Sequence, residues 1–301
     1  MRFLRLRPAR QSAVRTVLAI PLAAMVLAAC GDDGVDESPS ATAGAVTSSA
    51  GPPPTAAPVS GYLHATGDED VVVEIGFEGG FVPLEVMFAR VPNLLVTGSG
   101  RAIETGPVTQ IFPGPLLANL QERSITEVGI QALLAQADAL GLLADVEYAR
   151  NDLIADAADT VVRISVDGAT YEHRAYALGI DGDEGDTARA NLAEFVVAAA
   201  DLAGTVGASE LGVQSPFDGE AYLVRATPVT ADEIAGTEVE PTIVEWPAGS
   251  SVRLADAAEC AVVLAAEGDA LFVNATQLTF FADAGVTYRV AAISRLPGRG
   301  C

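Results

Sequence analysis

Few side chains in this sequence are suited to the common kinds of enzyme chemistry. There are two histidines, His64 and His173, and all 17 basic residues are arginine. Without lysine, a phosphate-binding P-loop and lysine-based covalent catalysis are excluded. The patterns H-E-x-x-H, C-x-x-C, G-x-S-x-G and G-x-G-x-x-G do not occur, so zinc, thiol-redox, serine-hydrolase and dinucleotide chemistry lack their usual residues. We therefore predict no catalytic residue, no metal ligand and no cofactor.

The 40 acidic residues leave two alternatives open. Paired carboxylates hydrolyse glycosidic bonds, so a carboxylate-dependent hydrolase acting on cell-wall glycans is the first alternative. A calcium loop that starts at Asp181 needs glycine at its sixth position and glutamate at its twelfth, where this chain has Asp186 and Leu192. Weak calcium binding in that acidic run, or by Asp68-Glu69-Asp70, gives the second alternative, a calcium-dependent adhesion module.

The three cysteines are Cys30, Cys260 and Cys301. Cys30 follows Leu27-Ala28-Ala29, at the end of a 13-residue apolar run that contains Pro21 and comes after five arginines. This layout resembles the lipobox signal peptide of bacterial lipoproteins. The resemblance implies that residues 1–29 are removed and that Cys30 carries a diacylglyceryl thioether with further acylation, such as palmitate. An uncleaved spanning helix is disfavoured because it needs roughly 20 apolar residues.

Acylation of Cys30 would leave Cys260 and Cys301 as an even pair in an oxidising compartment. We therefore predict a disulfide between them. The alternatives are two free thiols or a bond to another protein.

The charge of the chain also constrains its partners. Removal of the signal peptide takes away five of the 17 arginines and no acid, which leaves 12 arginines against 40 acidic residues and a formal charge of −28. Nucleic acid and anionic lipid headgroups repel such a surface. We predict no nucleic-acid partner, and membrane attachment on the extracytoplasmic face through the lipid on Cys30 alone.

Composition divides the chain into five parts. The first is the signal peptide, and the second is a disordered tether rich in Gly, Ser, Thr and Pro, which begins at the lipidated cysteine. An α+β domain, a glycine-marked linker and a β-rich module that carries the disulfide follow. The predicted boundaries are 1–29, 30–61, 62–204, 205–219 and 220–301.

The α+β domain is predicted as an antiparallel sheet, built from a meander and a hairpin, with two helices on one face. Strands are expected at 71–77, 84–89, 93–97 and 120–125, with an irregular loop at 105–117. Helices are expected from Thr126 to Gly141, capped by Ser124 or Thr126, and from Asp186 to Ala203, with Gly204 at its end.

The hairpin turn Asp167-Gly168 sets a register in which Val162 faces His173 and Arg163 faces Glu172. His173 then lies on the apolar face, which favours a core histidine.

For the C-terminal module, strands are predicted at 221–227, 237–246 and 252–254, a helix at 267–275, and a hairpin of 277–281 with 286–293. Trp246, Phe280, Phe281 and Tyr288 are expected to be buried. These strands either form a separate module, which we favour, or complete the first sheet.

Beyond the lipobox, the chain is similar only to uncharacterised lipoprotein domains, which imply no function. We predict a lipid-anchored envelope protein with a non-enzymatic binding or structural role, whose partner is an envelope protein or a wall polymer.

Overall fold

The computed structural model of this protein describes residues 61–150, 153–180 and 185–301. The predicted signal peptide, Cys30, the tether up to residue 60 and residues 181–184 of the acidic run lie outside the described residues. Among the helices of the described part, none is long and apolar enough to cross a bilayer.

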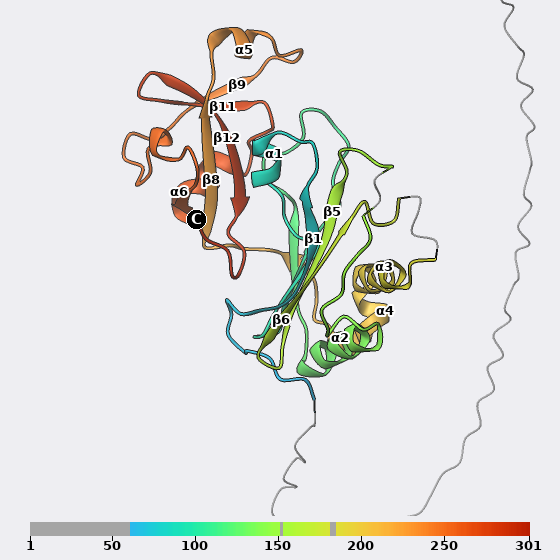
Figure 1. Cartoon of the computed structure of the whole chain (residues 1–301). Helices are drawn as coiled ribbons and strands as arrows, with labels where there is room; N and C mark the ends of the chain where they lie inside the picture. The colour runs from blue at the N-terminus through green and yellow to red at the C-terminus, as the bar shows by residue number, and fades with distance from the viewer. Residues whose placement is uncertain (1–60, 151–152, 181–184) are drawn as a thin grey trace, which may run out of the picture. The chain divides into compact units, whose positions relative to one another are not determined.

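Two β-sheets and several helices give an α+β fold, as predicted (Figure 1). The first sheet is antiparallel, has the strand order β6-β5-β1-β2-β3-β4-β7, and consists of β1 (Val71–Gly79), β2 (Leu94–Thr97), β3 (Arg101–Thr105), β4 (Leu120–Ser124), β5 (Ala158–Val166), β6 (Ala169–Tyr176) and β7 (Ser215–Pro216). The second sheet is mixed, has the order β10-β8-β12-β11-β9, and consists of β8 (Ala221–Pro228), β9 (Thr242–Glu245), β10 (Ala261–Leu264), β11 (Thr279–Asp283) and β12 (Val286–Ser294).

The helices are mostly short. They are α1 (Leu84–Phe88), α2 (Glu127–Ala139), α3 (Thr187–Ala200), α4 (Leu202–Val206), α5 (Ala231–Ala235) and α6 (Ala265–Phe272), with 3-10 turns η1 (Ala208–Glu210) and η2 (Leu254–Asp256). Figure 1 shows α2, α3 and α4 grouped on one side of the first sheet, which confirms the predicted arrangement.

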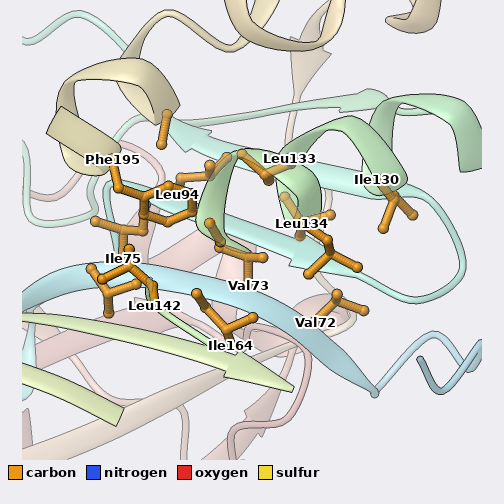
Figure 2. Packing of buried hydrophobic residues seen from close by; sticks show 14 of the residues in the cluster. Val72, Val73, Ile75, Leu94, Ile130, Leu133, Leu134, Leu142, Ile164 and Phe195 are labelled. Carbon is orange, nitrogen blue, oxygen red and sulfur yellow. The ribbon is translucent and has the colours of Figure 1, made fainter. Parts of the chain in front are cut away.

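The core of the first sheet lies between its strands and these helices. Alternate side chains of the strands, such as Val73 and Ile164, point toward Leu133 and Leu134 of α2 and Phe195 of α3 (Figure 2). All of these side chains are buried. The opposite face is covered only in part, where Leu95, Ile103 and Leu120 pack against Leu296, which follows β12.

The predicted hairpin of β5 and β6 is confirmed in every pair that the turn specified. Asp167 and Gly168 have φ values of 52° and 77°, as a two-residue turn of this type requires. Val162 pairs with His173, and Arg163 pairs with Glu172 through a bond of 2.8 Å from Nε.

The structure also shows which residue caps the first predicted helix. Thr126, rather than Ser124, is the N-cap of α2, and its hydroxyl accepts a hydrogen bond from the backbone of Gly129. Gly141 follows the helix with a φ of 74°.

Three predictions for the first domain are wrong. The strand predicted at 84–89 is instead α1 (Leu84–Phe88), because Pro83, which lacks an N–H, can start a helix and Leu, Glu and Met favour one. The third strand of the meander is instead β3. It was missed because Ala102 and Ile103 are both buried, on opposite faces of the sheet, so apolar and polar residues do not alternate along it. The helix predicted at 186–203 breaks at Asp201, whose side chain caps Gly204 inside α4.

The C-terminal strands form a sheet of their own. Trp246, Phe280, Phe281 and Tyr288 are buried as predicted. The predicted strand at 237–246 shortens to β9, which follows Pro241, and residues 252–254 lead into η2 instead of forming a strand. The sequence prediction missed α5 and the short edge strand β10. The predicted helix at 267–275 becomes α6 (Ala265–Phe272), and the predicted linker contains η1 and β7.

Candidate functional site

A groove of about 360 Å³ lies against the outer face of β1 and β5, on the side of the sheet away from α2 and α3. Four parts of the chain line it: β1, β5, the segment from α1 to Pro92, and the C-terminal Arg299. We call it the α1 groove. Its principal side chains are Glu74, Glu78, Met87, Arg90, Arg163 and Arg299.

The pattern of β1 places two carboxylates in the groove. Val73 and Ile75 point into the core, so the alternate residues Glu74, Gly76 and Glu78 face the other way. The pairing of β1 with β5 sets Arg163 opposite Glu74 and Val161 opposite Gly76. Gly76, between the two carboxylates, has no side chain, and Pro92 lies over it, with its Cα 3.4 Å from where a Cβ of residue 76 would stand.

The charges in the groove form one connected network. Arg163 bonds Glu78 at 2.7 Å and lies 3.6 Å from Glu74, so its guanidinium joins both carboxylates. Arg299 contacts Glu74 at 2.5 Å from the other end of the chain. On the neighbouring strand, Arg174 bonds Glu78 at 2.5 Å. These carboxylates are matched by guanidinium groups at close range.

The arginines hold Glu78 in its ionised form. Burial on its own raises the pKa of Glu78, but hydrogen bonds from Arg174 and Arg163 outweigh it, and the net pKa lies below the usual value. For Arg163, burial lowers the pKa, but the hydrogen bonds that it donates to Glu78 and Glu172 outweigh burial, so the net pKa is raised and the guanidinium stays charged. A general acid needs a carboxyl pKa that is raised toward neutrality. The arrangement around Glu78 is therefore that of an ion-paired wall and not of a proton donor.

Beside the groove, a run of large apolar side chains is exposed, which we call the apolar rim; two of them, Phe77 and Met87, line the groove itself. From the end of β1 through α1, five large apolar side chains are exposed: Phe77, Phe81, Leu84, Val86 and Met87. Phe81, at 85% exposure, is the most open of them. Exposed apolar groups that gather in one segment are typical of a surface that contacts another molecule.

The predicted site residues lie elsewhere. Cys30 is outside the described residues. Cys260 and Cys301 lie at disulfide-bonding distance, with Cα atoms 5.4 Å apart. His173 is buried; its Nε2–H donates to the Leu142 carbonyl at 2.7 Å, so its Nδ1 accepts from the Tyr148 hydroxyl at 2.8 Å. This is the satisfied core histidine that the pattern favoured.

His64 bonds the carboxylate of Glu127 at 3.1 Å and does not line the groove.

The acids considered for calcium have other partners. The Asp70 carboxylate accepts from the backbone of Gly67, and the Glu69 carboxylate accepts from the backbone of Gly298 and pairs with Arg295 at 3.2 Å. Within the residues that the structure describes, no group of three or more His, Cys, Asp or Glu side chains is placed to hold a metal ion.

Sequence reasoning missed the α1 groove. The alternation of Glu74, Gly76 and Glu78 against Val73 and Ile75 was a usable signal for a charged outer face of β1. The contributions of α1 and of Arg299 had no such signal, because one was assigned to a strand and the other is far away in the chain.

No family model, curated protein or solved structure matches this chain.

Proposed function

We propose that this chain is a lipid-anchored protein of the bacterial envelope, attached through Cys30 on the extracytoplasmic face, and that its folded body binds another envelope protein without catalysis. The lipobox-like sequence and the strongly acidic composition support the location. The cysteine pair at disulfide distance is consistent with an oxidising compartment.

The observation that carries the binding role is the exposed apolar rim beside the α1 groove. Protein interfaces are enriched in aromatic residues, Met and Arg around an apolar centre. The rim supplies Phe77, Phe81 and Met87, and the groove supplies Arg90 and Arg163. Because the charged wall is internally paired, recognition would depend on apolar contact with a partner and less on attraction of a charged ligand.

Site-specific cross-linking in intact cells tests this role. A photoreactive amino acid replaces Phe81 in the rim, and in a matched control it replaces Val197, which is 70% exposed on α3. We expect one envelope protein to be captured from position 81 and not from position 197. Equal capture from both positions, or capture of a labelled wall glycan alone, would contradict the proposed protein partner.

The anchor has a separate test. Cys30→Ser should abolish incorporation of an alkyne palmitate analogue, and it should either release the protein from membranes or leave it unprocessed, because several acyl chains are needed for stable attachment. Cys301→Ser serves as the control, since it removes a cysteine but leaves the proposed lipidation site. If Cys30→Ser both fractionates with membranes and migrates like the parent protein, the anchor is wrong.

A further inference from the structure

One sheet edge is much longer than the others. In the described part of the chain, the edge strands are β7 with 2 residues, β9 and β10 with 4 residues each, and β6 with 8 residues. A long edge presents a row of unpaired backbone groups that can bond another strand, and proteins commonly avoid this with short or covered edges. For β6, unlike the other three edge strands, we therefore ask what covers the unpaired backbone groups.

The turn determines which backbone groups of β6 point outward. In a hairpin with a two-residue loop, the flanking residues Val166 and Ala169 form a hydrogen-bonded pair, and every second residue after them repeats it. The bond of 3.0 Å from the Ala177 N–H to the Ala158 carbonyl continues this series. Odd-numbered residues of β6 thus bond β5, and the even-numbered residues Thr170, Glu172, Arg174 and Tyr176 direct their backbone groups away from it.

The outward groups are engaged at one end only. The Tyr176 carbonyl accepts a hydrogen bond from Arg189 at 3.0 Å, which confirms that it points away from β5. For Thr170, Glu172 and Arg174, the structure shows no backbone bond on the outer side to any other described residue. Thr170, Glu172 and Arg174 are exposed residues, and the side chains of Glu172 and Arg174 are 44% and 39% exposed.

Charge selects one way in which two copies of β6 can pair. Because only even-numbered residues point outward, a two-fold antiparallel pairing is centred on residue 172, 173 or 174. Centring on 172 sets Glu172 against its own copy, and centring on 174 does the same for Arg174. Centring on 173 sets Glu172 against Arg174 of the second copy, and Arg174 against Glu172. Opposite charges directly across a strand pair stabilise it, and like charges destabilise it.

We propose that two copies of this chain associate through β6 about a two-fold axis at residue 173. The two first sheets then form one continuous antiparallel sheet. Each Glu172–Arg174 pair across the axis exchanges two backbone hydrogen bonds, and its side chains bring opposite charges together. The occupant of the long edge is thus a second copy of the chain, because the edge is complementary to itself in charge.

The test uses charge reversal in the full-length chain carrying Cys30→Ser, so that no lipid contributes to association. Sedimentation velocity is measured up to the hundred-micromolar range. We expect the parent to form dimers. Glu172→Lys sets a lysine against Arg174 in both pairs, and Arg174→Glu sets two acids together, so each variant alone should dimerise about tenfold more weakly or worse.

A mixture of the two variants gives the decisive result. In a mixed dimer, the lysine introduced by Glu172→Lys faces the glutamate introduced by Arg174→Glu, and the unchanged Arg174 of one copy faces the unchanged Glu172 of the other. We expect the mixture to recover dimers, which misfolded variants cannot do. Asp232→Lys on the exposed α5 is the control for the change in net charge and should dimerise like the parent. A monomeric parent at all concentrations, or a mixture that stays monomeric, would overturn the proposal.

Discussion

The cores of the two sheets are built from different kinds of side chain. The buried core of the first sheet is aliphatic except for Phe195, and three helices cover it. The core of the second sheet is built around an aromatic cluster, with Tyr222, Trp246, Phe272 and Phe281 in ring contact. Among the α-helices of the described residues, α6 alone contributes to it. Large rings supply the apolar area that a second helical layer would otherwise provide.

The sheets also differ in how their buried polar groups are satisfied. In the first, His173 and the buried Arg189 bond backbone carbonyls, including those of Leu142 and Ala149. In the second, the buried Asp283 pairs with Arg253 and accepts from the backbone of Leu254 at 2.9 Å. The cysteine pair adds a cross-link to the second region. The comparison predicts that the second region depends on a few anchors, whereas the first distributes its stability over many residues.

The largest expected effect is the loss of the central ring of the aromatic cluster. Phe272 is fully buried and contacts three other rings, with Tyr222 at 5.2 Å between ring centroids. Phe272→Ala should lower the free energy of unfolding by about 3–5 kcal/mol, because it removes a buried ring and leaves a cavity. Denaturant unfolding measures the change.

The control for this variant is Phe81→Ala, which removes an exposed ring and should change the free energy of unfolding by less than about 0.5 kcal/mol. Hydrogen exchange then sharpens the comparison. We expect Phe272→Ala to lose protection in β8 and β12 before β1 and β5. Uniform loss across both sheets would show that the two cores unfold together.

The next largest effect is expected from the cysteine pair. Cys260 precedes β10 and Cys301 ends the chain, with 41 residues of separation. Restricting a loop of this length in the unfolded chain contributes about 2–4 kcal/mol. Cys260→Ser combined with Cys301→Ser should lower the free energy of unfolding by that amount. The parent should fall to the same value with reductant, and the variant should not respond to it.

Turn chemistry was the most predictable part of the fold. Asp167-Gly168 and Ala284-Gly285 both have positive φ values, and both hairpins formed where the sequence placed them. These signals are local, because a few neighbouring residues determine the backbone conformation of a turn. The same holds for Thr126 and α2. A missed local signal was Thr230 with Glu233, a capping box that starts α5.

The α1 groove was not predictable in the same way. Glu74 and Arg299 are in contact although 225 residues separate them, and no pattern in the sequence connects them. The short strand β10 was missed because its four residues carry too little periodicity to identify a strand. Tertiary packing, rather than local preference, determines these features.

The pH response of the first region should come from His173. Burial lowers its pKa, and the Leu142 carbonyl and Asp145 oppose that change only in part. As the pH falls, the unfolded chain, whose histidine has its ordinary pKa near 6.5, therefore binds a proton at a higher pH than the folded chain does. Stability from this group is complete above that pH and is lost as the pH falls below it, by at most about 1.4 kcal/mol per pH unit.

Unfolding at pH 7 and pH 5 measures this loss. His173→Gln, which has no titrating ring, should lose less stability over the interval than the parent protein. His64→Gln leaves His173 in place. In this variant His173 should therefore still take up a proton on unfolding, as it does in the parent protein. An identical pH dependence of the parent and His173→Gln would show that the buried ring does not titrate in this range.

The smallest effects come from two helix caps and test whether the contrast between the regions extends to their helices. Thr126 caps α2, a helix with five buried residues that covers the first sheet. Thr230 caps α5, a five-residue helix in which no residue is buried.

Thr126→Ala should lower the free energy of unfolding by about 1 kcal/mol, because the backbone N–H of Gly129 loses its acceptor and α2 is part of the core. Thr230→Ala removes an equivalent hydrogen bond, yet it should cost only a few tenths of a kcal/mol, because α5 can fray without exposing a buried side chain. Equal losses in chemical denaturation would mean that α5 is as tightly coupled to its sheet as α2 is, against the difference that the two cores suggest.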